Sequence, residues 1–148
     1  FFYYSYALVL PMIMVPFSWG IILLAFVCMH FVTGTLVSVV FQIAHIMPDT
    51  KFPLPDKEGL INNNWYGHQL ATTCNFSPNS SLLFWLIGGL NYQVEHHLLP
   101  DVCHVHYKQL TKIVAETAEE FGMPYHVKKS MYHAIVAHTK MLRSLGKA

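Results

Sequence analysis

The first 48 residues contain no Asp, Glu, Lys or Arg, so all nine Lys and Arg and all eight Asp and Glu lie after Pro48. A soluble helix rarely stays this apolar beyond about 14 residues, whereas about 20 apolar residues are enough to cross a bilayer. As one helix, the run would extend about 72 Å, more than twice the hydrocarbon thickness of about 30 Å. We therefore predict a transmembrane helical hairpin over residues 1–45.

The hairpin is expected to turn within VPFSWG, residues 15–20. Pro16 removes a backbone donor, Ser18 can cap a following helix, and Trp19 suits the membrane interface. The second arm, residues 19–44, is long enough to span, and the first arm is short. The first residue is not Met, and the sequence begins inside an apolar pattern. The basic segment and the small-residue cleavage site of a signal peptide are not found. We expect a missing N-terminal part rather than a signal peptide.

Other scarcities exclude whole classes of function. The net charge is +1, and the sequence has no basic cluster, so we expect no nucleic-acid partner. The three cysteines are odd in number and have no CxxC spacing, which argues against a disulfide framework. We find no internal repeat and no convincing strand pattern. The predicted fold class is therefore all-α.

Residues 46–148 are expected to form an interfacial and cytosolic helical region. The turn-rich stretch 47–64 predicts a surface loop, and the apolar stretch 81–90 is too short to span, which favours an interfacial helix. Helical spacing follows over 106–122, with a stripe at Leu110, Ile113, Val114, Thr117 and Phe121. A last helix is expected after the capping residue Ser130, ending at Gly146.

The stretch NYQVEHHLLP, residues 91–100, carries the strongest site signal. On a helix, Gln93, His96 and His97 project from one face, where they can converge on an ion. Imidazole is a ligand for iron, zinc and copper. An isolated histidine pair is more often a surface residue beside a packed one. A membrane-adjacent setting favours function, because ionisable groups there are costly.

Other histidines are more ambiguous. His45 ends the second arm with Gln42 one turn earlier, which fits either interface anchoring or a metal ligand with its outer partner. His68 is expected in a polar loop, with a structural role favoured over one in shaping the site. His30, in the middle of the second arm, is expected to pack or to form an interhelical hydrogen bond.

The stretch GGLNYQVEHHLLP resembles the third histidine box of the membrane-bound fatty acid desaturases. Most branches of that family have HxxHH there, and the front-end branch, which includes delta-5- and delta-6-like enzymes, has QxxHH. The flanking stretches HQLATTCNF and CHVHY are also similar to that branch. The resemblance covers essentially the whole chain, as the C-terminal part of an enzyme with four transmembrane helices.

The resemblance implies an integral membrane oxidoreductase with two iron ions at its cytosolic face and O₂ as co-substrate. It implies a fatty acyl substrate, linked to CoA or to lipid, and an electron donor such as ferredoxin or a cytochrome b-type domain. His96 and His97 match ligands of the third box, and His45 matches a histidine near the end of the fourth membrane helix. Gln93 stands at a histidine position, where weak ligation, holding a water and orienting a neighbour are all open.

Further residues are expected around the metals rather than on them. The expected supporting or substrate-channel residues are Gln42, His68, Asn91 and Tyr92. The aromatic side chains Phe84 and Trp85 are channel candidates with Tyr92, although simple packing is favoured for any single one of them.

The sequence departs from the family pattern because the first two histidine boxes, which precede this hairpin in the family, are absent. We therefore expect the chain to supply only part of one di-iron site and to be inactive alone. Two alternatives stay open: a related membrane di-iron fatty acyl hydroxylase, and a non-catalytic membrane protein whose histidines bind zinc or nothing.

Overall fold

The computed structural model describes residues 1–61 and 64–147. It divides into two compact units, residues 1–39 and 40–148, which are taken separately below. Nearly all regular structure is helical, which confirms the predicted all-α class.

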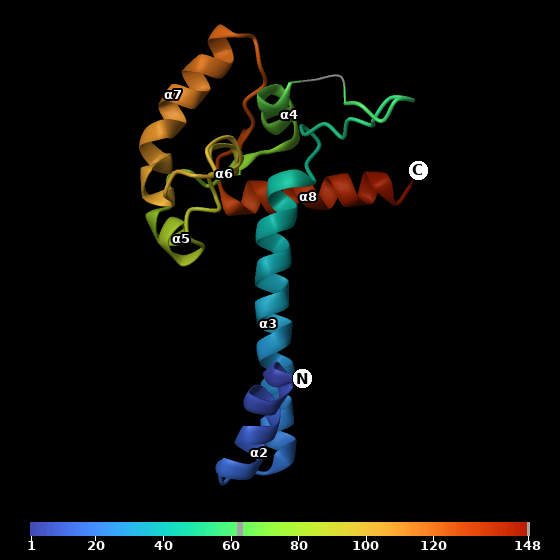
Figure 1. Ribbon diagram of the computed structural model, residues 1–148, viewed down its shortest axis with the longest axis vertical. Helices are drawn as coiled ribbons and strands as arrows, with labels where there is room; N and C mark the ends of the chain where they lie inside the picture. The colour runs from blue at the N-terminus through green and yellow to red at the C-terminus, as the bar shows by residue number, and fades with distance from the viewer. Residues whose placement is uncertain (62–63, 148) are drawn as a thin grey trace. The chain divides into compact units, whose positions relative to one another are not determined.

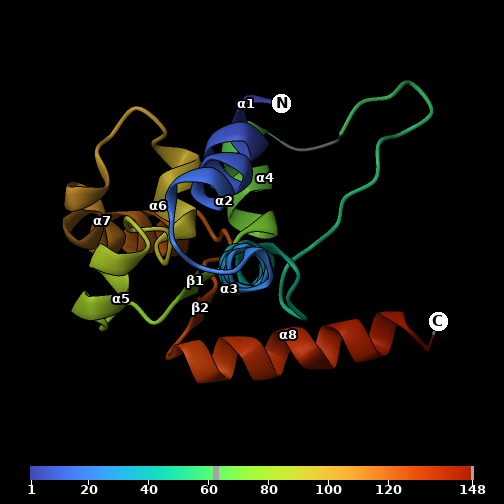
Figure 2. The same ribbon diagram turned by 90° about the horizontal axis from the view of Figure 1, so that it is seen from below.

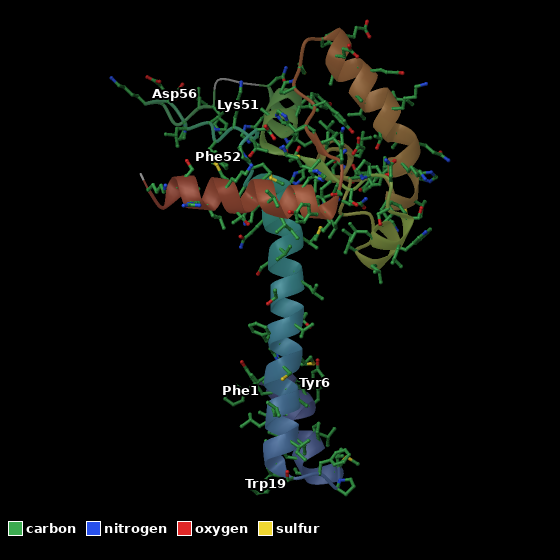
Figure 3. The ribbon with its side chains drawn as sticks, turned by 180° about the vertical axis from the view of Figure 1, so that it is seen from behind. Phe1, Tyr6, Trp19, Lys51, Phe52 and Asp56 are labelled. Atoms are coloured by element: carbon green, nitrogen blue, oxygen red, sulfur yellow. The ribbon has the colours of Figure 1, made fainter. Side chains whose placement is uncertain are left out.

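The first unit is a helical hairpin (Figure 1). Its short arm consists of α1 (Phe2–Tyr4), the π-helix η1 (Ser5–Val9) and α2 (Leu10–Met14), and its long arm is the first part of α3 (Trp19–His45). The chain leaves the helix at Val15, whose backbone is extended (φ −102°, ψ 135°), because the following Pro16 disfavours the helical region. Trp19 lies at this turn (Figure 3) and donates from its indole nitrogen to the Met12 carbonyl at 3.2 Å.

The long arm has the properties of a membrane span. Among the described residues, α3 is the one helix long and apolar enough to cross a membrane, and only 6% of its apolar 18-residue window is buried within the chain. The two arms are joined by a hydrogen bond from the Tyr3 hydroxyl to His30 Nε2 at 2.8 Å, while His30 Nδ1 donates to the Phe26 carbonyl at 2.8 Å. His30 therefore makes the interhelical hydrogen bond expected from the sequence.

The second unit packs short helices around α6. The helices after α3 are α4 (Trp65–Thr72), α5 (Ser81–Leu86), α6 (Gln93–Leu98), the 3₁₀ turn η2 (His104–His106), α7 (Tyr107–Glu120) and α8 (Met131–Leu145). α6 lies between α4 and α7 (Figure 2). One buried side chain from each of the three helices, Leu70, Val94 and Ala118, contributes to a hydrophobic cluster of the core.

A small parallel ladder, not expected from the sequence, ties the second unit together. β1 (Asn75–Phe76) pairs with β2 (Val127–Lys128), so Asn75 stands opposite Val127. The bonding continues on both sides, from Asn75 N to the His126 carbonyl and from Ser77 N to the Lys128 carbonyl. Two residues are too few to display the alternating pattern from which a strand is predicted.

Helix boundaries follow local chemistry. Ser130 caps α8 by accepting from His133 N, and Gly146 follows its end, as predicted. The helix expected over 81–90 ends at Leu86, because Gly88 and Gly89 adopt positive φ values of 61° and 76°. His68 lies on α4, so its placement in a loop was wrong.

The segment after α3 is a long irregular loop, as predicted. Lys51, Phe52 and Asp56 lie on it (Figure 3). The predicted loop also includes Asn62 and Asn63, which lie outside the described residues.

Candidate functional site

Helix α6 presents the residues of the QxxHH pattern from one face. Gln93 is almost fully buried, and His96 and His97 are half-buried. The two residues between them, Val94 and Glu95, are completely buried on other faces of the helix.

Three histidines predicted as metal ligands lie together. The ring of His45, at the end of α3, meets the ring of His97 edge to face with centroids 4.9 Å apart. The His96 and His97 rings are 5.6 Å apart. The contact between His45 and His97 joins positions 52 residues apart, which sequence spacing alone could not establish.

Hydrogen bonds to one ring nitrogen orient two of these histidines. His45 Nδ1 lies 3.3 Å from the Thr72 carbonyl, which fixes Nδ1 as the donor. His96 Nδ1 lies 3.3 Å from the Tyr107 hydroxyl. A partner on Nδ1 leaves Nε2 available to a metal, the usual arrangement around histidine ligands.

His97 is held in its neutral form. Burial lowers its pKa to about 4, with smaller contributions from His45 and His96. At neutral pH, His97 therefore keeps a lone pair that can bind a cation without first releasing a proton.

Gln42 has a different partner from the one expected. Its amide oxygen lies 3.1 Å from His138 Nε2, and His138 Nδ1 lies 2.9 Å from the Ile46 carbonyl. His138 comes from α8 and is buried. Sequence reasoning missed this contact, because the only signal was a histidine on the apolar side of an amphipathic helix.

Several buried polar atoms at the site have no hydrogen-bond partner: Gln93 Nε2, His68 Nδ1 and Asn91 Oδ1. Such atoms are rare in folded proteins. His68 lies on α4 and Gln93 on α6, and these two helices are in contact. The interior near the QxxHH segment therefore contains buried polar atoms without hydrogen-bond partners.

The donor set fits part of an iron site. Clustered imidazoles suit iron, and the amide oxygen of Gln93 can add an oxygen donor. Within residues 1–61 and 64–147, no three His, Cys, Asp or Glu side chains lie close enough to hold an ion by themselves.

Asn91 and Tyr92 fasten the segment that enters α6. The Tyr92 hydroxyl donates to the Pro78 carbonyl at 2.5 Å, and Asn91 Nδ2 donates to the Ser77 carbonyl at 3.3 Å. The Tyr92 ring also lines a cavity of about 200 Å³ with the two channel candidates Phe84 and Trp85.

Glu95 is a further residue that the sequence analysis did not assign. Its carboxyl group is completely buried and accepts hydrogen bonds from Asn75 and Tyr125. The sequence signal that could have identified Glu95 is its position within the QxxHH segment, next to an apolar residue. A glutamate is rarely fully buried unless it has a partner.

Comparison with known proteins places the chain in the family that the sequence resembles. The sequence model of the family described as fatty acid desaturase matches residues 1–129. An acyl-lipid (8-3)-desaturase of Physcomitrium patens is 40% identical over 144 residues, which cover 97% of this chain and 30% of that protein. An sn-1 linoleoyl-lipid 6-desaturase of Synechocystis sp. is 41% identical over 116 residues, covering 78% of this chain and 32% of that protein.

A third relative is more distant. It is the Delta(5) fatty acid desaturase A of Dictyostelium discoideum, 36% identical over 125 residues, which cover 82% of this chain and 27% of that protein. The chain thus spans about a third of the length of these curated relatives. No solved structure matches it significantly.

Proposed function

The chain belongs to the fatty acid desaturase family, and we propose that the full-length protein is a front-end desaturase that introduces a double bond into a fatty acyl chain. We propose further that His45, His96 and His97 are iron ligands at the cytosolic face of the membrane, with Gln93 as a weak or water-mediated ligand. Gln42, His68, Asn91 and Tyr92 are assigned to the surroundings of the metals or to the substrate channel.

The observation that carries this proposal is the contact between His45 and His97. The two rings come from the end of the apolar helix α3 and from the QxxHH segment, and their centroids are 4.9 Å apart. Packing alone rarely selects two ionisable side chains for such a place, whereas a shared cation needs both.

The chain's own residues orient and protect the proposed centre. Thr72 and Tyr107 hold the Nδ1 atoms of His45 and His96, and burial keeps His97 neutral. Two iron ions, when bound, supply the O₂-dependent oxidation of the substrate. In the overall reaction, a CH₂–CH₂ pair loses two hydrogens and O₂ becomes two waters, with two electrons and two protons supplied in addition.

Substrate and electron donor are proposed by class. A fatty acyl chain reaches the centre from the membrane, and the printed names of two relatives, which act on acyl lipids, favour a lipid-linked chain over acyl-CoA. A ferredoxin or a cytochrome b-type domain is the proposed source of electrons. Tyr92, with Phe84 and Trp85 around the cavity of about 200 Å³, is proposed to contact the acyl chain.

The test is expression of the full-length protein in cells that do not make the desaturated fatty acid. The lipids of these cells are then analysed by mass spectrometry, and the purified protein is analysed for iron. We expect a fatty acid two mass units lighter and two irons per chain. Replacing a ligand, as in His96→Ala or His97→Ala, should lower activity by more than about 100-fold, beyond the loss typical of an outer partner. Membrane-inserted protein should remain at the parental level.

A matched control is His133→Ala, which changes an exposed histidine on α8 and should keep both iron and product. An added hydroxyl in place of the double bond would support the hydroxylase alternative. Absence of iron from the active full-length protein would rule out both di-iron functions. Retention of most activity by His96→Ala or His97→Ala would refute the ligand assignment.

A further inference from the structure

The buried carboxyl group of Glu95 is the centre of a hydrogen-bond network on the face of α6 opposite the proposed ligands. Its Oε1 accepts from the Tyr125 hydroxyl at 2.6 Å, and its Oε2 accepts from Asn75 Nδ2 at 2.8 Å. Asn75 Nδ2 also donates to the Tyr125 hydroxyl at 2.8 Å. The three side chains therefore form a closed ring of hydrogen bonds.

Asn75 also reaches the backbone of α6. Its Oδ1 accepts from Val94 N at 2.8 Å, so the donors and the carbonyl oxygen of this amide are all used. Val94 is the second residue of α6, where the backbone N–H has no partner within the helix. The residue before α6, Tyr92, gives no side-chain cap. Asn75 thus caps α6 from β1.

The network lies on the face of α6 opposite the proposed ligands. At about 100° per residue, Glu95 projects roughly 150° away from the centre of the face formed by Gln93, His96 and His97. A helix of six residues is too short to be stable by itself, so its direction and rotation depend on outside contacts. The apolar contacts of Val94 are non-directional, whereas hydrogen bonds to Glu95 and Val94 N allow one rotation.

We propose that Asn75, Glu95 and Tyr125 are positioning residues that set the rotation of α6 and thereby aim His96 and His97 at the metals. This inference rests on the proposed function for the identity of the metals, and on hydrogen-bond geometry alone for the fixing of α6. Groups at a working site must be held within about 0.5 Å and 10–20°. β1 and the chain after α7, held together by the β1–β2 ladder, supply that support.

The test compares two variants of the full-length protein, Tyr125→Phe and Glu95→Gln. The first removes one hydroxyl from the ring. The second keeps the shape but turns an amide N–H₂ towards a donor. Each should lower iron affinity or kcat by about 10- to 100-fold, the loss typical of partners of metal ligands. KM for the acyl substrate should stay within about twofold, because neither residue lies on the ligand face of α6.

A second measurement does not depend on metal or activity. In metal-free protein, hydrogen exchange at the backbone amides of Val94 and His96 should be faster in both variants than in the parent. Ser130→Ala is the matched control, because it removes the side-chain cap of α8, a helix outside the hydrogen-bonded ring. It should leave iron affinity, kcat and α6 exchange unchanged.

The inference is overturned if both variants keep parental iron affinity and kcat, or if exchange in α6 is unchanged in both. It is also overturned if Ser130→Ala loses iron to the same extent, because general destabilisation would then explain the effect. A parent protein without iron or desaturation would refute the proposed function instead, and exchange in α6 would still decide whether the network fixes the helix.

Discussion

Cys74 and Cys103 stand in opposite environments. Cys74 is completely buried between α4 and β1, and burial raises its pKa to about 11, whereas Cys103 is exposed. The thiolate is the reactive form, so at pH 8 only about one Cys74 in a thousand is ionised. Cys74 should therefore resist alkylation in the folded protein.

Peptide mapping by mass spectrometry after treatment with iodoacetamide checks this prediction. Cys103 should be modified at pH 8 within the time in which Cys74 stays unmodified, and unfolding in denaturant should make the two rates equal. Equal rates in the folded protein would contradict the burial of Cys74.

The sequence identified some residues of the candidate site better than others. His45, His96 and His97 could be named because they match positions of the family's histidine pattern, whereas helical spacing alone left a structural role open for each. Glu95 and His138 could not, because their importance comes from partners 20 and 30 residues away for Glu95 and about 90 residues away for His138. A hydrogen bond between distant segments leaves no periodic trace in the sequence.

Among the elements, the turn between α5 and α6 offers a matched pair of substitutions. Gly88 and Gly89 both have positive φ, but a Cβ on Gly88 would meet nothing within 4 Å, and one on Gly89 would lie 2.8 Å from the Cβ of His104. Gly88→Ala should cost about 1 kcal/mol from backbone strain. Gly89→Ala should cost a further 1–3 kcal/mol, roughly, from overpacking.

Thermal unfolding of the detergent-solubilised full-length protein measures the difference. The melting temperature should fall more for Gly89→Ala than for Gly88→Ala. Equal losses would mean that the close approach of the turn to η2 is not a constraint on the fold.

The attachment of α8 to the end of α3 depends on His138. His138→Ala would leave the Gln42 amide oxygen and the Ile46 carbonyl without their partner, and each buried unsatisfied group costs about 1–3 kcal/mol. We expect limited proteolysis to cut the segment before α8 faster in this variant. Lys140→Ala, an exposed change on the same helix, should behave like the parent, and equal cleavage of all three proteins would contradict the prediction.

The orientation of α7 shows what helical spacing cannot predict. The bounds of the helix agreed with its sequence pattern, but Ile113 and Phe121, expected on its apolar stripe, are exposed. The buried positions are Tyr107 and Ala118, with Val114 partly buried. The small side chain of Ala118 lets α7 approach the core residues Leu70 and Val94. Which face of α7 is buried therefore depends on the shape of α6.

At the scale of the whole molecule, the uncharged N-terminal region predicts membrane insertion. Val32 is an exposed apolar residue in the interior of α3, and an Arg at the centre of a span costs about 2.5–3.5 kcal/mol on insertion scales. Val32→Arg should reduce the share of protein that resists alkaline extraction from membranes. Val32→Leu and Val105→Arg, the latter in η2, should extract like the parent, and an unchanged Val32→Arg would argue against a span by α3.

The hydrogen-bonded ring behind α6 bears on how relatives are recognised. The pattern QxxHH describes one face of the helix and leaves the residue on the opposite face unspecified. That residue is Glu95, which is hydrogen-bonded to Asn75, 20 positions earlier, and to Tyr125, 30 positions later. A more selective search profile would therefore read Asn, then QxEHH, then Tyr at those intervals. Substitutions at the three positions are expected to occur together across related genomes, and a lineage that replaced one alone would need another anchor for the same helix.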